Sequence, residues 1–296
     1  MVNIKMPANM MIGPPTLRIK DLQRQMSFYE KELNLQVNHR YRADDDLETI
    51  ELGFKGKFKD CREPLLILKH DPNAKETTHN FAGLYHFAIL VPDRKSLASA
   101  YSSIDNSKTR FDGFADHLVS ESLYLHDPER NGIEIYRDKP RNEWKYDTKG
   151  HIVMDTIPLD LKSLLAELGT YEGKNITFPN GAKIGHMHLR VTNLERSLRF
   201  YQKLGFDVTA DMSAMGACFL SAGGYHHHIG MNIWHSLDGK MHVKDESGLD
   251  FLMIRIPDCS FIEILAQEFE DRILQRDSNA ILVSDPDGIH VLIKFH

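Results

Sequence analysis

The sequence is poor in cysteine and has no excess of positive charge. Its three cysteines, Cys61, Cys218 and Cys259, form no Cys-x-x-Cys pair, which fits neither a disulfide framework nor a thiolate metal site. We expect these thiols to be reduced and buried. The net charge of −6 is spread along the chain, without the basic stripe that binds phosphate backbones. Nucleic acid is therefore not an expected partner.

Long apolar runs are also missing. No stretch approaches the length of a membrane span, and residues 1–15 lack the apolar core and cleavage site of a signal peptide. With 296 residues, 42% hydrophobic and 26% charged, the chain has a globular composition and fits one large or two ordinary domains. We therefore expect a cytoplasmic protein, in a reducing compartment that would help to keep a metal such as Fe(II) reduced.

What the chain does contain is an internal repeat. The segment "LRIKDLQRQMSFYEKELNLQV" from Leu17 is echoed by "LRVTNLERSLRFYQKLGFDV" from Leu189. A second echo relates "GLYHFAILVPD" (83–93) to "GLDFLMIRIPD" (248–258), and a third relates "DPERNGIEIY" (127–136) to "DPDGIHVLI" (285–293). The chain is therefore interpreted as a tandem duplication.

Each repeated unit has the pattern βαβββ. An apolar run with β-branched residues leads into an Asp or Asn cap and a helical stripe, followed by short strand-like runs between Gly, Pro and Asp/Asn clusters. Four such modules are expected, at 14–70, 82–137, 183–236 and 247–295. We predict an α+β fold with two half-barrel cups. Its expected domains are residues 1–137 and 183–296, joined by a helical connector at 138–182.

Three side chains in the modules form a candidate metal site. His86 lies on the first strand and Glu134 on the last strand of module two, and His186 lies on the first strand of module three. Two imidazoles and one carboxylate make the facial triad favoured by non-haem Fe(II), which leaves open positions for a chelating substrate and O₂. A single strand histidine is more often a core residue, but matching positions in matching modules favour a common locus. The equivalent places in modules one and four have lost these ligands and are Pro14, Phe251 and His290.

Other polar residues receive structural interpretations. Strand alternation through "YHHHIG" (225–230) would place His226 and His228 on the face opposite His227, so a structural role is expected for both. Arg18 and Arg190 occupy equivalent repeat positions, which favours a shared structural role over a substrate anchor.

These motifs together resemble the vicinal oxygen chelate superfamily, which includes glyoxalase I, bleomycin and fosfomycin resistance proteins and extradiol dioxygenases. The four βαβββ modules, "GHMHLRV…LERSLRFY", "DP…NGIEIY" and "YHHHIG" carry this resemblance over nearly the entire chain. More narrowly, "HLVSESLYLHDP" (117–128), "NGIEIYRDKPRNEW" (131–144) and "SAGGYHHHIGMNIW" (221–234) are similar to the catechol 2,3-dioxygenase branch.

The resemblance implies a site and a reaction. Extradiol dioxygenases bind Fe(II), occasionally Mn(II), at positions that match His86, Glu134 and His186. A histidine that exchanges protons with substrate and oxygen matches His227, and a hydrogen-bonding His–Tyr pair matches His117 and Tyr124. The implied reaction cleaves a catechol beside its two hydroxyls to a 2-hydroxymuconate-semialdehyde type of product. The partners would be a small aromatic diol and O₂, with a homo-oligomer left open and no membrane.

The ligand positions depart from the family's better-known two-domain enzymes, in which the C-terminal pair of modules supplies the whole triad. Here the active cup would pair module two with module three, either within one chain or across a dimer. Modules one and four would then form a metal-free cup. Three alternatives remain: a hydroquinone-type ring-cleaving dioxygenase, a glyoxalase-like metalloenzyme with one more metal ligand, and a non-catalytic drug-binding resistance protein.

Overall fold

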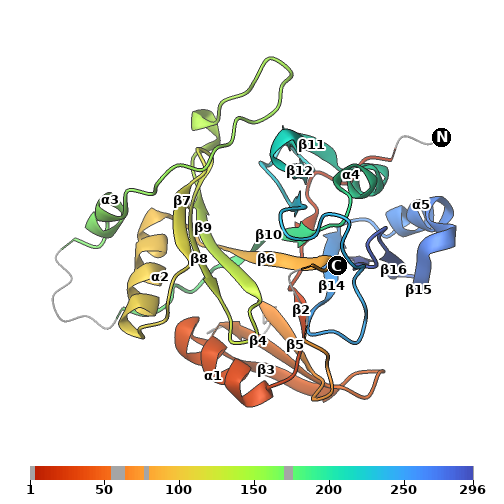
Figure 1. Ribbon diagram of the computed structural model, residues 1–296, viewed down its shortest axis with the longest axis horizontal. Helices are drawn as coiled ribbons and strands as arrows, with labels where there is room; N and C mark the ends of the chain where they lie inside the picture. Colours follow the sequence, from red (N-terminus) through yellow and green to blue (C-terminus); the bar gives the residue numbers. More distant parts are fainter. Residues whose placement is uncertain (1–3, 55–63, 77–79, 170–175, 296) are drawn as a thin grey trace.

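The computed structural model describes residues 4–54, 64–76, 80–169 and 176–295 (Figure 1). Its elements follow the order strand, helix and three strands four times, so the predicted α+β fold of four βαβββ modules is confirmed. Modules one and two contain β2 (Thr16–Ile19), α1 (Leu22–Glu32), β3 (Leu35–Arg42), β4 (Glu48–Phe54), β5 (Leu66–His70), then β6 (Gly83–Leu90), α2 (Arg94–Asn106), β7 (Gly113–Asp116), β8 (Ser120–His126) and β9 (Gly132–Asp138). Modules three and four contain β10 (Lys183–Arg190), α4 (Leu194–Lys203), β11 (Asp207–Met212), β12 (Ala217–Ser221), β13 (Ile229–Asn232), then β14 (Gly248–Ile256), α5 (Ser260–Glu268), β15 (Ile273–Arg276), β16 (Ala280–Ser284) and β17 (His290–Phe295).

The strands form two curled sheets, each made from one module of either half of the sequence. One sheet has the order β15-β16-β17-β14-β2-β5-β4-β3, with β1 (Met11–Ile12) paired to β14, and so joins modules four and one. The other has the order β11-β12-β13-β10-β6-β9-β8-β7 and joins modules three and two. Modules two and three therefore pair within one chain. The division into 1–137 and 183–296 describes the sequence repeat, whereas each cup draws on both halves.

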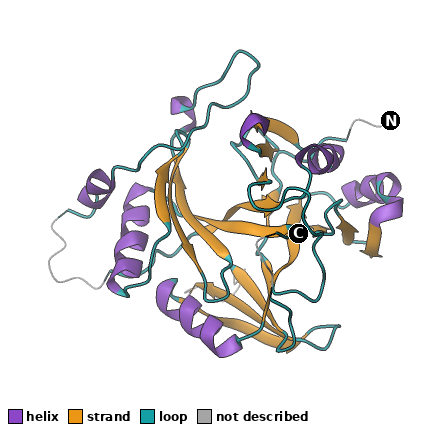
Figure 2. Ribbon diagram, in the orientation of Figure 1, coloured by secondary structure: helices purple, strands orange, loops and turns teal. Residues whose placement is uncertain are grey.

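Local sequence explains the helices and their place on the outside of the sheets (Figure 2). Asp21 caps α1 by accepting a hydrogen bond from the amide of Arg24, and Asn193, its repeat equivalent, caps α4 in the same way. The apolar stripe of each helix packs onto a sheet, and the sheets carry buried Leu, Ile and Val side chains on their inner strands.

A repeated tyrosine–aspartate hydrogen bond joins the modules that are neighbours in sequence. The hydroxyl of Tyr29 in α1 donates to Asp127 Oδ2 (2.8 Å), and that of Tyr201 in α4 donates to Asp285 Oδ2 (3.1 Å). All four residues are buried. Sheet pairing therefore connects modules two with three and one with four, while these hydrogen bonds connect one with two and three with four.

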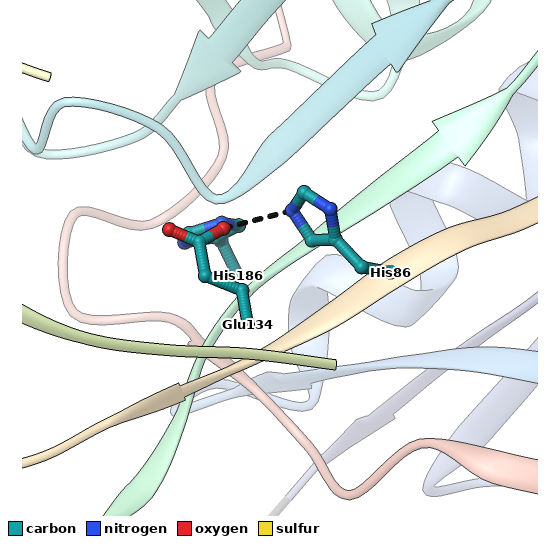
Figure 3. Close-up of side chains that lie close together, drawn as sticks. All are labelled: His86, Glu134 and His186. Atoms are coloured by element: carbon teal, nitrogen blue, oxygen red, sulfur yellow. Dashed lines mark hydrogen bonds and ion pairs between the residues drawn. The ribbon is translucent and has the colours of Figure 1, made fainter. Parts of the chain in front are cut away.

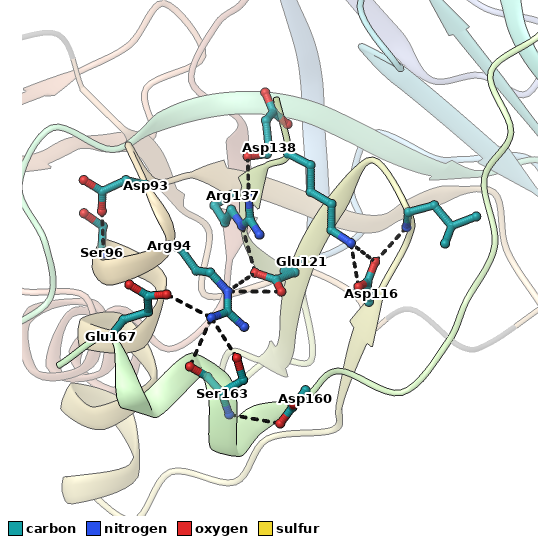
Figure 4. Close-up of polar contacts among 12 residues, drawn as sticks. Asp93, Arg94, Ser96, Asp116, Glu121, Arg137, Asp138, Asp160, Ser163 and Glu167 are labelled. Atoms are coloured by element: carbon teal, nitrogen blue, oxygen red, sulfur yellow. Dashed lines mark hydrogen bonds and ion pairs between the residues drawn. The ribbon is translucent and has the colours of Figure 1, made fainter. Parts of the chain in front are cut away.

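The segment between the halves is held to the outer face by ion pairs (Figure 4). Arg94 of α2 donates to Glu121 of β8 and to Glu167, which follows the connector helix α3 (Leu161–Ala166). Arg137 also donates to Glu121, at 2.8 Å. Burial alone would raise the pKa of Glu121, but the two guanidinium groups hold that pKa below its usual value.

Two details differ from the sequence-based expectations. Residues 226–228 lie in the loop before β13, which begins at Ile229, so the prediction of a histidine triplet on a strand is wrong. The tight turn after β12, with Gly223 and Gly224 at positive φ, delays the start of the strand. Cys218 is buried, as expected. Cys259 is exposed because it precedes α5 on the surface, so the expectation of a buried thiol is wrong at this position. Cys61 lies outside the described residues. Within the described ranges, no helix is long and apolar enough to cross a membrane.

The buried carboxyl of Asp285 predicts a pH dependence of stability. Burial and the neighbouring Asp287 raise its pKa to about 7, well above the roughly 3.9 of an unfolded aspartate. The folded state therefore binds an extra proton between these values, so this contribution to stability is present at low pH and is lost as pH rises through 7. The slope amounts to at most about 1.4 kcal/mol per pH unit. Asp285→Asn should flatten this slope in urea unfolding between about pH 5 and pH 7.5; an unchanged slope would contradict the assignment.

Candidate metal centre

Three adjacent strands bring the candidate ligands together. Strand β6 pairs in parallel with β9 and antiparallel with β10, so His86 lies between the strands that carry Glu134 and His186. The three side chains point toward one another on the inner face of this sheet (Figure 3). Three neighbouring strands of one chain thus supply all three candidate ligands.

The three ligand atoms are close together and buried. Glu134 Oε2 lies 2.9 Å from His86 Nε2 and 3.0 Å from His186 Nε2, and one ligand atom from each residue lies within 4.8 Å of the others. All three residues are at most 6% exposed. His86 Nε2 makes no hydrogen bond of acceptable geometry with any described residue, although it is enclosed and near a carboxylate. A buried nitrogen without a hydrogen bond is costly, and a cation between the three groups would satisfy it.

The electrostatics of the site suit a divalent metal. Burial alone would raise the pKa of Glu134, but the adjacent His186 and His86 hold that pKa well below its usual value. Burial lowers the pKa of His186 to about 4, against the opposing effect of Glu134. The site therefore offers an ionised carboxylate and a neutral imidazole at neutral pH, as metal ligands require. In the part of the chain that the structure describes, this is the one group of three His, Cys, Asp or Glu side chains found with such spacing.

A serine that the sequence analysis did not identify orients the carboxylate. Ser122 Oγ donates to Glu134 Oε1 at 2.6 Å and leaves Oε2 facing the histidines. Ser122 lies two residues before Tyr124 on β8, so strand alternation places both on one face. Strand alternation from the predicted Tyr124 could therefore have identified Ser122 from the sequence.

The predicted His117–Tyr124 pair is present beside the ligands. His117 Nδ1 lies 2.9 Å from the carbonyl oxygen of Asp155, which can only accept, so Nδ1 carries the proton. His117 Nε2 then accepts from the hydroxyl of Tyr124 at 2.6 Å. Burial and nearby Glu134 raise the pKa of Tyr124 well above its usual value, so the phenol stays protonated.

His227 ends a directed chain of hydrogen bonds. Asp138 Oδ1 accepts from His226 Nε2 (2.8 Å) and from the hydroxyl of Tyr225 (3.1 Å). The hydroxyl of Tyr225 also lies 2.7 Å from that of Tyr136. His226 Nδ1 lies 2.8 Å from His227 Nδ1. A His226 that carries one ring proton, on Nε2 toward Asp138, accepts at Nδ1; His227 then donates from Nδ1 and keeps the lone pair on Nε2. The loop geometry thus places Asp138, His226 and His227 in one hydrogen-bonded chain.

This chain changes the interpretation of the triplet. His226 contacts His227 directly and does not lie on an opposite strand face, because the segment is a loop. His228 faces elsewhere and lies 2.8 Å from Ser221 Oγ. Asp138 could have been found from its alternation with Glu134 along β9, whereas the contact of His226 depends on a loop and has no sequence signal.

The candidate residues share one cavity of about 1100 Å³, lined by His86, His117, Tyr124, Glu134 and His227 among others. This volume is at the upper end of small-molecule sites. The structure therefore brings two of the predicted ligands, His86 and Glu134, and the predicted proton-handling residues around one space, with the third ligand, His186, buried behind them in contact with Glu134.

The cup of modules one and four holds ion pairs in place of ligands. Arg18 donates to Asp71 (2.9 Å) and to Asp250 (3.0 Å), and Lys69 lies 3.0 Å from Asp250. Arg18 and Asp250 are buried. The charges of Arg18, Lys69 and Asp250 in this second cup are therefore paired with other side chains of the same cup.

Comparisons with known proteins agree with this architecture. A model of the Glyoxalase/Bleomycin resistance protein/Dioxygenase superfamily matches residues 11–135 and 183–292. The chain is 37% identical over 279 residues to a catechol-2,3-dioxygenase of Bacillus subtilis (strain 168), which covers 93% of each chain. Among solved structures, a putative dioxygenase from Bacillus subtilis matches with a TM-score of 0.65 at 12% identity, covering 99% of this chain and 86% of that one. Glyoxalase I from Zea mays matches with a TM-score of 0.58 at 16% identity, covering 97% and 92%. These two structural matches show a shared fold.

The geometry predicts which substitutions abolish metal binding. Glu134→Gln and His86→Ala each remove a ligand. Loss of a residue that only hydrogen-bonds to a ligand lowers metal affinity by up to about 100-fold, so loss of a ligand itself should lower the affinity for Fe(II) by more than that. His290→Gln is the matched control, because His290 holds the place of Glu134 in the other cup. Metal content after anaerobic dialysis against Fe(II) measures this. Full metal content in Glu134→Gln, or equal loss in His290→Gln, would contradict the assignment.

Proposed function

The chain belongs to the Glyoxalase/Bleomycin resistance protein/Dioxygenase superfamily, and from that premise we propose that it is an extradiol dioxygenase that cleaves catechols. The proposed reaction uses Fe(II), with Mn(II) as the other candidate metal, and O₂, and gives 2-hydroxymuconate-semialdehyde-type products. The observation that carries the proposal is the His86–Glu134–His186 triad, two of whose members, His86 and Glu134, line a cavity together with His117, Tyr124 and His227. The catechol-2,3-dioxygenase relative supports the same reaction class.

His86, Glu134 and His186 would hold the metal through two nitrogens and one oxygen. A metal held by this set would supply a Lewis acid for the catechol oxygens and O₂. Ser122 holds Glu134 through Oε1 and leaves Oε2 facing the two histidines. The protein's part is therefore to fix the geometry of the ligands.

His227 is assigned as the base that accepts a catechol proton. Its Nδ1 is occupied by His226, so the lone pair on Nε2 is the available acceptor. Burial, and then the neighbouring His186, lower the pKa of His227 well below its usual value, so the ring is neutral at neutral pH and its Nε2 lone pair is free, while its basicity is reduced. The same proton can later be returned to a product oxygen.

Tyr124 and His117 are assigned to position an oxygen of the substrate. Because the phenol proton is donated to His117 Nε2, the oxygen of Tyr124 presents lone pairs to the cavity and can accept a hydrogen bond from a substrate hydroxyl. His117 is held in turn by the carbonyl oxygen of Asp155, so the pair is oriented before substrate binds.

The glyoxalase-like alternative requires a fourth protein ligand. The group found among the described residues has three, and the neighbouring polar residues are the histidine and tyrosine hydrogen-bonding groups described above. The resistance-protein alternative requires no ligands at all. The ring-cleaving assignment uses all of these residues.

Oxygen uptake tests the proposed reaction. Protein purified without air and loaded with Fe(II) should consume O₂ when catechol is added and should form a yellow ring-fission product. Metal-free protein is the control. Absence of oxygen uptake with catechol, substituted catechols and hydroquinones would contradict the proposal.

His227→Phe separates proton transfer from metal binding. The variant should keep its metal, because His227 is not a ligand, but kcat should fall by about 100-fold or more through loss of the base. His228→Gln is the matched control within the triplet, since His228 bonds to Ser221 and should leave kcat within about threefold of the native value. Loss of metal in His227→Phe would make His227 a ligand and overturn its assignment.

Asp138→Asn tests the chain behind His227. An amide can donate as well as accept, so the tautomers of His226 and His227 would no longer be fixed. We expect kcat to fall by about tenfold with metal content and KM unchanged. Unchanged kcat would mean that the directed chain plays no part in the reaction.

A further inference from the structure

We propose that the substrate carries a carboxylate on its ring or on a short side chain, and that Arg190 binds this group. The inference rests on the proposed function, since it identifies the substrate class of the same cavity. It is carried by an arginine that lines the cavity and whose charge is not balanced by the protein.

Arg190 lies on the same face of β10 as the metal ligand. His186, His188 and Arg190 alternate along the strand, so Arg190 is four residues, or roughly 13 Å, from the ligand. Arg190 lines the cavity together with His86 and His227. This spacing suits an aromatic ring that is held at the metal by one edge and carries a substituent on the far side.

Arg190 has no carboxylate partner among the described residues. Its Nε is buried without a hydrogen bond, and the group whose charge interaction opposes the effect of burial on its pKa is the phenol of Tyr85. Burial lowers the pKa of Arg190, but an arginine remains charged at neutral pH. A partly buried cation without a counter-ion is unfavourable, so an anionic ligand would stabilise it.

The internal repeat provides a control for this observation. Arg18 is the equivalent of Arg190, and its Nε is likewise buried without a hydrogen bond, but in the second cup its two terminal nitrogens are paired with Asp71 and Asp250. Strand register gives the equivalent of each counter-ion. Gly248 pairs with Arg18 and lies two residues before Asp250. Gly83 pairs with Arg190 and lies two residues before Tyr85, so Tyr85 occupies the place of Asp250. On the other side, Lys69 pairs with Arg18 and Asn232 pairs with Arg190. Two residues further along, Trp234 therefore occupies the place of Asp71.

The metal-binding cup thus has aromatic residues at the two places where the second cup has carboxylates. The arginine is common to both cups, whereas the two counter-ions are present only beside Arg18. The expectation that Arg18 and Arg190 share a structural role is therefore wrong, because their partners differ.

The other acidic side chains that line the cavity contact groups other than Arg190: Asp21 caps α1, and Asp155 accepts from the amide of Thr156. Glu129 accepts from the backbone amides of Lys20 and Asp21. Glu76 lies 3.9 Å from Lys20 Nζ, and Asp112 contacts His126.

The replacement residues form an aromatic wall beside Arg190. The ring centroids of Tyr85 and Trp234 are 5.4 Å apart, and His188 lies 5.0 Å from Tyr85 and 5.8 Å from Trp234, and all three residues line the cavity. His188 Nε2 lies 3.0 Å from Asn232 Nδ2, which can only donate, so this ring is held in place. Aromatic edges next to a planar guanidinium favour a planar substrate with a carboxylate, which arginine can bind in a bidentate manner.

Calorimetric binding without O₂ tests the inference independently of turnover. The Fe(II)-loaded protein is titrated with 3,4-dihydroxyphenylacetate and with 4-methylcatechol, which share the vicinal diol and differ in the carboxylate. We expect the carboxylate compound to bind at least about tenfold more tightly to the native protein, as for one charge-assisted contact. Arg190→Met should remove this preference while 4-methylcatechol still binds within about threefold of its native affinity. Arg190→Lys should retain part of the preference.

Arg24→Met is the matched control, since Arg24 is an exposed arginine that lines the same cavity. It should leave the preference unchanged. The inference would be overturned if the native protein bound both compounds equally, or if Arg190→Met weakened the binding of both compounds to the same extent. If Arg190→Met fails to fold, the comparison of the two compounds on the native protein still decides. If the carboxylate compound binds through Arg190 but neither diol is consumed with O₂, the proposed function is wrong and the anion site stands.

Discussion

The antiparallel pairing of β6 with β10 is the constraint on which the site depends. It joins two modules that lie in different halves of the sequence, and it places His86 directly opposite His188 and close to His186. The parallel partner of β6 then supplies Glu134. Because β6 lies between β9 and β10, the three ligands can meet only if these modules form one sheet, as they do within a single chain.

The two cups show how one repeated scaffold can meet two electrostatic requirements. Buried charge must be paired, and in the cup of modules one and four Arg18 and Asp250 pair within the protein. In the cup of modules two and three, the ionised Glu134 and the guanidinium of Arg190 face a shared cavity. The negative charge of Glu134 suits a metal cation, and the positive charge of Arg190 suits an anionic group of a ligand. The cup that has lost its internal ion pairs is thus the one equipped to bind.

Sequence alone predicted the features that depend on local pattern. The four βαβββ modules, the Asp21 and Asn193 caps and the convergence of His86, Glu134 and His186 follow from the repeat and from strand alternation. The histidine triplet was misplaced because a glycine turn, and not a strand, precedes Ile229. The contact between His226 and Asp138 and the missing counter-ions of Arg190 depend on which distant strands and loops meet, and a single sequence gives no register between modules.

The most direct test of the central claim is the position of metal in crystals grown without air in the presence of Fe(II). Anomalous diffraction at the iron edge should show one strong peak per chain, bounded by His86, Glu134 and His186, and none near Arg18 and Asp250. A peak in the second cup, or none at the three predicted ligands, would contradict this account.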